Sequence, residues 1–328
     1  VPALPPTQHA FAFEWVGLIG RRAPLRREVP AAIERCRRAG IRVIMMTGDY
    51  SQTARIIADQ AGLDEGVLTG EELRTLENRE LVAKISRAGV LARMVPQDKL
   101  RVVQALRERG HVVGMTGDGV NDAPSLRWAD VGIAMGKRGT DVARESADLV
   151  LLDDDFSSIV EGIDRGRIIL RNMRLAMGYV IAFHVPIAGL AVAPVLMGWP
   201  LVLSALHIVL LELIIDPACS ILFENPRIAS DAMSVPPRDP QKPFFSREDF
   251  FRSTVEGAVI LASLLVSYAH WIAHPTGEAS ARTIVFMQLV ISNLSLILAR
   301  VGFLRSARSF LSSPLHADML GGLLTLIV

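Results

Sequence analysis

Two short segments of this sequence carry the same residues, Thr-Gly-Asp, each directly after an apolar run that predicts a buried strand. They are Thr47-Gly48-Asp49 and Thr116-Gly117-Asp118. In a parallel sheet, the carboxyl ends of the strands line the ligand crevice. Threonine hydroxyls and glycine N–H groups there can hold phosphoryl oxygens, and carboxylates can hold Mg²⁺, which prefers oxygen ligands. The repeat therefore predicts a crevice that binds phosphate and Mg²⁺.

The second segment is the more specific of the two. Gly-Asp is a common turn pair, so one copy alone would more often be an ordinary turn. The longer string Met-Thr-Gly-Asp-Gly-Val-Asn-Asp-Ala-Pro, residues 115–124, argues against that interpretation. Its Asp118 and Asp122 are the candidate metal ligands, and Gly119 is expected to let the chain turn between them. The candidate supporting residues are Thr116, Gly117, Gly119 and Asn121.

Lys99 is a further candidate for phosphate chemistry. It follows Val-Pro-Gln-Asp, residues 95–98, at the start of a predicted helix. A lysine beside a carboxylate crevice can neutralise a phosphoryl group, although a lysine at a helix start is more often a solvated charge. The sequence therefore predicts a catalytic set of Thr47, Gly48, Asp49 and Lys99.

These residues need a fold that brings strand ends together, and the first half of the chain alternates strands with helices. The predicted strands cover residues 11–19, 41–46, 91–95, 111–115, 130–135 and 147–152, and the predicted helices cover residues 29–39, 51–61 and 96–109. Such alternation favours a parallel sheet with helices on both faces. We expect an α/β, Rossmann-like domain over residues 1–160.

The second half is apolar in long blocks. The predicted membrane helices cover residues 175–197, 201–223, 253–273 and 283–300, and residues 319–328 would begin a fifth. Each full block is near the ~20 residues needed to cross a bilayer, and none shows the polar face of a soluble helix. A stalk helix over residues 161–174 is expected to join the α/β domain to this helical bundle, which membrane lipid would surround.

Loop charge predicts the orientation in the membrane. The connections over residues 224–252 and 301–318 are rich in arginine and lysine, whereas the other two are nearly free of them. By the positive-inside rule, the basic loops and the α/β domain share the cytoplasmic side. With a net charge of +1 and no dominant basic stripe, no nucleic-acid partner is expected.

Acidic residues inside the predicted spans suggest an ion pathway. Glu212 and Asp216 are four residues apart and share one helix face, and carboxylates within a membrane are costly and usually functional. His184, Gln288 and Asn293 are further candidates. Interhelical hydrogen bonding explains Gln288 and Asn293 equally well, and a histidine such as His184 more often serves helix packing.

Together these motifs resemble the P-type cation-transporting ATPases, above all calcium pumps and related bacterial cation ATPases. Residues 41–49, 95–99 and 115–124 resemble three motifs of the family's haloacid-dehalogenase-like phosphorylation domain, and residues 148–173 resemble its stalk. The resemblance implies an ATP-driven cation pump in a bacterial plasma membrane that uses Mg²⁺ and takes ATP as its substrate. It also implies that Thr47 and Lys99 contact an aspartyl phosphate.

The sequence departs from the family pattern in three respects. The phosphorylated string Asp-Lys-Thr-Gly-Thr is absent, with the nucleotide-binding domain that normally follows it, and the hinge string Asp-Pro-x-Arg reads Ala23-Pro24-Leu25-Arg26. The family's first four membrane helices and its actuator domain are not present either. We therefore expect both ends to be truncations, with a missing N-terminal part of the pump as partner. The alternatives are a non-catalytic pseudo-pump or truncated remnant, and a membrane-anchored phosphatase, which would also need an aspartate nucleophile.

Overall fold

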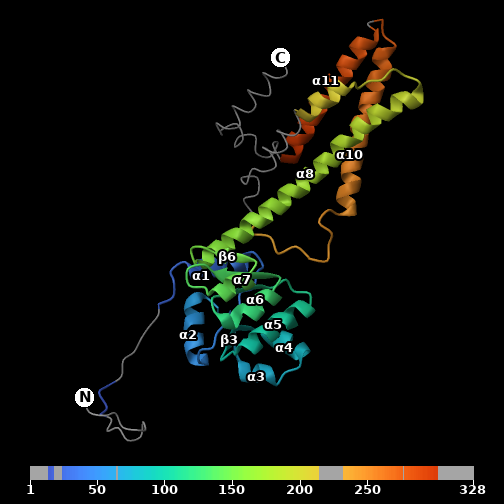
Figure 1. Ribbon diagram of the computed structural model, residues 1–328. Helices are drawn as coiled ribbons and strands as arrows, with labels where there is room; N and C mark the ends of the chain where they lie inside the picture. The colour runs from blue at the N-terminus through green and yellow to red at the C-terminus, as the bar shows by residue number, and fades with distance from the viewer. Residues whose placement is uncertain (1–13, 18–23, 64–65, 214–231, 276, 302–328) are drawn as a thin grey trace.

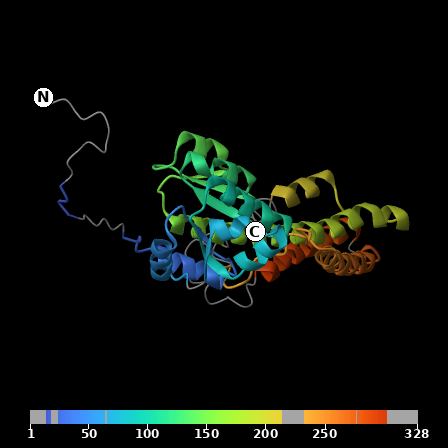
Figure 2. The same ribbon diagram turned by 90° about the horizontal axis from the view of Figure 1, so that it is seen from below.

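A computed structural model describes residues 14–17, 24–63, 66–213, 232–275 and 277–301. Residues 24–155 form an α/β domain from which one long helix, α8, runs to two further long helices, α10 and α11 (Figure 1). The view from below also shows α8, α10 and α11 side by side (Figure 2). The predicted fold class, a parallel-sheet α/β domain followed by long apolar helices, is confirmed.

The first sheet of the α/β domain has three parallel strands in the order β1-β3-β2. They are β1 (Met45–Met46), β2 (Gly66–Thr69) and β3 (Ala88–Ala92). All five residues of the central strand β3 are buried. Val90 and Ala92 pack on one face, and Leu91 packs on the other. Strand alternation thus gives this sheet two covered faces, as a parallel sheet requires.

Helices cover both faces of this sheet. The first face carries α1 (Val29–Arg38) and α2 (Ser51–Ala61), and the second carries α3 (Gly70–Arg74), α4 (Asn78–Ile85) and α5 (Pro96–Glu108). Small residues of α2, Ala54 and Ala58, let that helix lie close to the sheet. Pro96 at the first position of α5 fixes where that helix begins.

A second parallel sheet has the order β4-β5-β6. Its elements are β4 (Gly114–Gly117), β5 (Val131–Met135) and β6 (Leu149–Leu151), with η2 (Val120–Asp122), α6 (Ala123–Trp128) and α7 (Asp141–Ser146) between them. Met115, Leu126 and Ala134 form its core together with Val103 of α5.

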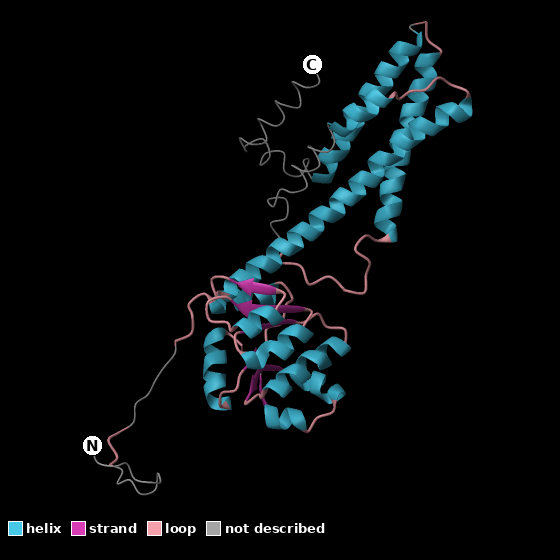
Figure 3. Ribbon diagram, in the orientation of Figure 1, coloured by secondary structure: helices cyan, strands magenta, loops and turns pink. Residues whose placement is uncertain are grey.

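The two sheets meet through their end strands, and Figure 3 shows the strands in two groups. In the described part of the chain, β1 and β4 each pair with one strand only, β3 and β5 respectively. Met46 of β1 packs against the core of the first sheet and against the core of the second. Side-chain packing therefore joins two half-sheets whose end strands lack a shared ladder.

Helix α8 (Phe156–Met197) is continuous from the α/β domain into the apolar region. The Asp155 carboxylate caps it by accepting the Ser157 N–H at 2.8 Å. The predicted stalk, residues 161–174, and the predicted first span, residues 175–197, are thus one helix. Pro186 and Pro194 lie inside this helix, where each removes one main-chain N–H donor.

Three described helices are long and apolar enough to cross a membrane: Phe156–Met197, Arg247–Ile272 and Gly277–Ile297. They lie in α8, α10 (Arg247–Ile272) and α11 (Gly277–Val301), and pack around a core that includes Tyr179, Leu264 and Leu289. Residues 201–213 are the described part of the predicted second span, and of these residues 205–213 are helical, whereas residues 201–204 are not. The rest of that span, most of the 301–318 loop and residues 319–328 lie outside the described residues.

The predicted helices of the α/β domain are confirmed as α1, α2 and α5, but several strand boundaries were wrong. Strand β1 covers only the last two residues of the predicted 41–46 strand, and β3 ends before residues 93–95. The reason for the second error is Arg93, whose φ of 53° is incompatible with a strand. Of the predicted 11–19 strand, only residues 14–17 are described, and they are not in a strand.

Helices α8 and α10 approach closely at a glycine, which yields a prediction about stability. A Cβ atom on Gly257 would lie 2.4 Å from the Ala182 carbonyl oxygen, whereas one on Gly162 of α8 would have nothing within 4 Å. We expect Gly257→Val to lower the free energy of unfolding by about 1–3 kcal/mol through overpacking. The matched control Gly162→Val should change it far less. Thermal unfolding in detergent measures both, and equal effects would contradict the proposed contact.

Candidate functional site

An ion pair between Lys99 and Asp122 lies where the two half-sheets meet. The Lys99 Nζ donates to Asp122 Oδ1 at 2.7 Å. Lys99 belongs to the first turn of α5, which follows the first sheet, and Asp122 follows β4 of the second. Asp122 is only 7 % exposed, so solvent screens the pair weakly. Two residues that the sequence predicted separately are therefore in direct contact.

The loop after β4 holds Asp122 in place. The Asp122 Oδ2 accepts the Gly119 N–H at 3.3 Å. A Cβ atom on Gly117 would lie 2.5 Å from the Asp122 Cβ, so only glycine fits there. Gly119, which the sequence led us to expect at the turn, is extended with φ −103° and a Cβ there would clash with nothing. The glycine that this loop needs is Gly117.

The first Thr-Gly-Asp segment is tied to the chain that leads into α5. Thr47 donates its N–H to the Leu91 carbonyl at 2.9 Å and accepts the Met94 N–H at 3.0 Å. The Thr47 Oγ1 also accepts the Asp49 N–H at 3.1 Å, which tightens the turn. Gly48 and Asp49 are exposed. This segment thus lies at the same carboxyl edge of the first sheet from which the Lys99 helix begins.

Asp118 differs from Asp122 in that its side chain is exposed directly after β4. Its carboxylate oxygens are the hard ligands that Mg²⁺ prefers, so the donor chemistry fits. Among the described residues, no group of three His, Cys, Asp or Glu side chains is placed to hold a metal ion. Mg²⁺ usually keeps waters and takes substrate phosphate as a further ligand. Asp118 therefore suits a metal that arrives with a phosphoryl group.

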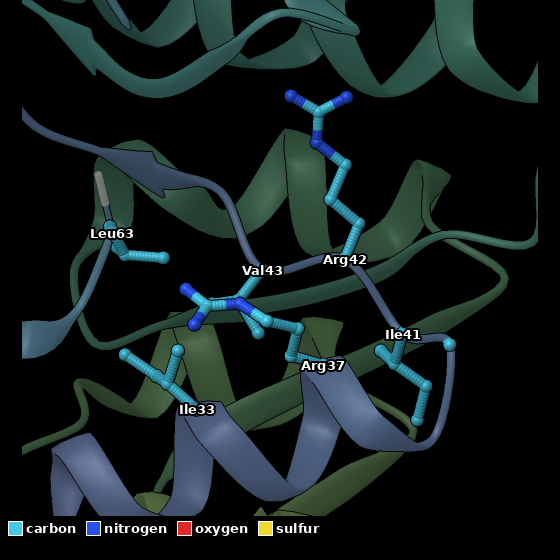
Figure 4. Close-up of a pocket in the computed structure, with 7 residues that line it drawn as sticks. Ile33, Arg37, Ile41, Arg42, Val43 and Leu63 are labelled. Carbon is cyan, nitrogen blue, oxygen red and sulfur yellow. The ribbon is translucent and has the colours of Figure 1, made fainter. Parts of the chain in front are cut away.

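A hollow in the described structure lies away from these residues. Its volume is about 240 Å³, and Ile33, Arg37, Arg42 and Leu63 are among the residues that line it. Figure 4 shows the Arg42 side chain pointing away from Ile33 and Leu63. Arg42 donates to the main-chain oxygens of Ile85 and Ala88 at 2.7 and 2.9 Å. This arginine is therefore occupied in joining elements of the first sheet, and no predicted site residue lines the hollow.

The predicted ion-pathway residues lie in different environments. Asn293 of α11 is buried and its Oδ1 accepts a hydrogen bond from the Tyr179 hydroxyl of α8. Gln288 is half-buried, whereas His184 and Glu212 are exposed. His184 Nδ1 lies 2.7 Å from the carbonyl oxygen of Val180, one turn earlier. The described residues thus link α8 to α11 through Asn293 but form no closed ion site, and Asp216 lies outside them.

Two buried carboxylates, Asp98 and Asp154, were not predicted as site residues, and Asp154 is the more deeply buried. Asp154 is 4 % exposed and lies between β6 and α8. Its carboxylate accepts the Lys137 and Arg138 main-chain N–H groups, each at 3.0 Å. The only sequence signal is the acidic run of residues 153–155, which does not reveal which of the three carboxylates turns inward.

Comparison with known proteins assigns the two halves of the chain to two family descriptions. Residues 4–130 match the description haloacid dehalogenase-like hydrolase, and residues 200–328 match cation transporting ATPase, C-terminus. The chain is 39% identical over 280 residues to Calcium-transporting ATPase 1 of Bacillus cereus, covering 81% of this chain and 30% of that protein.

Two further relatives give the same result. The chain is 38% identical over 285 residues to a calcium-transporting ATPase of Bacillus subtilis, covering 85% of this chain and 32% of that protein. It is 36% identical over 299 residues to a cation-transporting ATPase of Synechocystis sp., covering 87% of this chain and 32% of that protein. The chain thus spans about a third of the length of these relatives.

The contact between Lys99 and Asp122 predicts a specific loss of stability. Asp122→Asn leaves the half-buried lysine charge without its counter-ion, so we expect a loss of about 1.5–3 kcal/mol. Adding Lys99→Met should restore part of the loss, because the charge is then removed as well. The control Asp141→Asn, in an exposed i,i+3 pair with Arg144, should cost far less. Additive effects of Asp122→Asn and Lys99→Met in denaturant unfolding would exclude the coupling.

Proposed function

Because this chain belongs to the P-type cation-transporting ATPases and matches about a third of its relatives' length, we propose that it supplies the Mg²⁺-binding and phosphate-stabilising half of an ATP-driven cation pump. The observation that carries this proposal is the Lys99–Asp122 pair at 2.7 Å. Its lysine belongs to the helix that follows β3 and its aspartate follows β4, and Asp118 remains exposed. A cation, an exposed carboxylate and a threonine at one sheet edge suit phosphoryl transfer, which depends on positioning and charge.

The order of the strands supports a missing central strand. A strand that paired with both β1 and β4 would join the half-sheets into one sheet of order β2-β3-β1-x-β4-β5-β6. The carboxyl end of that strand would lie between the two Thr-Gly-Asp segments. We propose that this strand carries the phosphorylated aspartate and belongs to a segment outside these 328 residues.

Each predicted residue then has a role. Thr47, Gly48 and Thr116, with Gly117, would hold phosphoryl oxygens, and Lys99 would neutralise their charge. Asp118 would bind Mg²⁺ and Asn121 would support it. Asp122, a predicted metal ligand, is bound to Lys99 in the structure; we propose that it positions the lysine and neutralises it when phosphate is absent. Mg²⁺, when bound, would supply positive charge to the transferred phosphoryl group.

The membrane helices would carry the transported cation. Glu212 and Asp216 would be its acidic ligands, and His184, Gln288 and Asn293 would contribute further polar atoms. The α/β domain would face the cytoplasm of a bacterial cell, on the side of the basic loops. The second candidate function is a non-catalytic pseudo-pump, which Ala23 favours because it replaces the hinge carboxylate of the family string.

Phosphorylation by ATP tests the enzymatic part of the proposal. A chain completed with an upstream segment that contains Asp-Lys-Thr-Gly-Thr should incorporate radiolabel from γ-labelled ATP in an acid-stable, Mg²⁺-dependent form. Asp118→Asn should reduce the labelling at least about 100-fold, comparable to the loss of an electrostatic stabiliser. The exposed Asp59→Asn, on α2, serves as the charge-matched control and should label normally. A folded, completed chain that never labels would instead support the pseudo-pump.

Cation dependence tests the membrane part separately. In the completed chain, Glu212→Gln and Asp216→Asn should lower the apparent affinity for the cation that stimulates ATP hydrolysis. We expect at least a tenfold change, since each removes a charged ligand. Phosphorylation from inorganic phosphate, which needs no transported cation, should be retained in both variants. Unchanged cation dependence would remove these two residues from the ion pathway.

A further inference from the structure

Asp154 occupies a strained position that a polar network holds in place. Its φ is 59°, a left-handed conformation that only glycine, asparagine and aspartate adopt readily. Burial raises the pKa of the Asp154 carboxyl group. The hydrogen bonds that include those from the main-chain N–H groups of Lys137 and Arg138 outweigh this effect, so the pKa lies below its ordinary value. The fold therefore stabilises the charged carboxylate of Asp154, which accepts these two hydrogen bonds.

The residues that Asp154 holds belong to a short loop, residues 136–140, between β5 and α7. The far end of this loop reaches the candidate Mg²⁺ site, because the Thr140 N–H donates to the Asp118 carbonyl oxygen at 2.9 Å. Within the loop, Arg144 Nη1 donates to the carbonyl oxygens of Gly136 and Gly139 at 2.9 and 2.6 Å. Five successive residues are therefore fixed at both ends and in the middle.

The loop of residues 136–140 is tightly packed, so it has little room to deform. A Cβ atom on Gly139 would lie 1.9 Å from the Met135 carbonyl oxygen, and one on Gly136 would lie 2.6 Å from that of Leu151. Gly136 also donates its N–H to the Leu151 carbonyl at 2.8 Å. A displacement of Asp118 must therefore pass along the loop, because close-packed groups shift together.

The opposite side of Asp154 reaches the membrane helix. The next residue, Asp155, caps α8 through the Ser157 N–H at 2.8 Å. The Arg26 guanidinium, from the hinge-like string, donates to the Asp154 carbonyl oxygen. Asp154 thus has three links. Its side chain binds the loop of residues 136–140, and its carbonyl oxygen accepts the hydrogen bond from Arg26. Its peptide bond leads directly to Asp155, the cap of the 42-residue helix α8.

We propose that Asp154 is a positioning residue that couples Mg²⁺ binding at Asp118 to the first turns of α8, through the loop of residues 136–140. The coupling rests on the proposed function only in that Asp118 binds Mg²⁺.

Hydrogen exchange measured by mass spectrometry tests this on the full 328-residue chain in detergent micelles. Mg²⁺ is titrated at constant ionic strength in the presence of inorganic phosphate, with NaCl as the control salt. Peptides spanning residues 116–124 report the metal site, and peptides spanning residues 156–166 report the start of α8. In the unmodified chain, we expect Mg²⁺ to slow exchange in both sets at the same Mg²⁺ concentration, by about fivefold, the low end of allosteric coupling.

Two variants separate coupling from folding. Asp154→Asn and Asp154→Gly both tolerate φ 59° but lose the two-oxygen acceptor. We expect both to keep Mg²⁺ protection of residues 116–124 and to lose it over residues 156–166. Unchanged exchange in α2, residues 51–61, verifies that the variants are folded. The control Asp59→Asn removes the same charge from the exposed face of α2 and should behave like the unmodified chain.

Three outcomes would overturn the proposal, and they differ from each other. Protection of α8 that persists in folded Asp154 variants would show that this residue does not carry the coupling. Protection confined to residues 116–124 in the unmodified chain would show that no coupling exists. Protection of neither segment would remove the Mg²⁺ site at Asp118, and with it this part of the proposed function.

Discussion

The organisation of the α/β domain depends on one constraint: two parallel half-sheets must present their carboxyl ends at the same edge. The Lys99–Asp122 pair joins these ends directly, since its lysine follows β3 and its aspartate follows β4. Met46 supplies the apolar part of the same junction by packing against both cores. No ladder joins β1 to β4 among the described residues, so side-chain contacts and the connecting helix α5 fix the relative position of the Thr47 and Asp118 segments.

Helix α8 is connected to the same part of the α/β domain. Its cap, Asp155, directly follows the residue that holds the loop connected to Asp118. Arg167, one-quarter of the way along the helix, donates to the main-chain oxygens of Ala39, after α1, and of Val235, in the connection before α10, at 2.9 and 2.8 Å. The helix is therefore anchored to the α/β domain at two heights before it enters the apolar bundle. Under the proposed coupling, such anchoring would pass a local change near the sheet edge to the first turns of α8.

Much of this arrangement could be predicted from the sequence, for reasons that are local. The position of each Thr-Gly-Asp segment near the end of a strand and the start of α5 at Pro96 depend on residues adjacent in the chain, so the sequence pattern predicts both well. The end of β3 could not be found in this way, because the left-handed Arg93 interrupts an apolar run. Likewise, the inward turn of Asp154 and the contact between Lys99 and Asp122 arise from tertiary packing, which the identity of neighbouring residues does not determine.

Asp118 and Asp122 are only four residues apart, but the fold places their carboxylates in different environments. Two free carboxylates at this distance would repel each other and attract a cation without orienting it. Here the Asp122 charge is balanced by Lys99, and its second oxygen accepts the Gly119 N–H. Asp118 keeps its oxygens exposed. Asp118, Asp122 and Lys99 together therefore leave one uncompensated negative charge in the loop after β4, and a cationic lysine beside it favours an anionic phosphoryl group as a further ligand of a bound divalent metal.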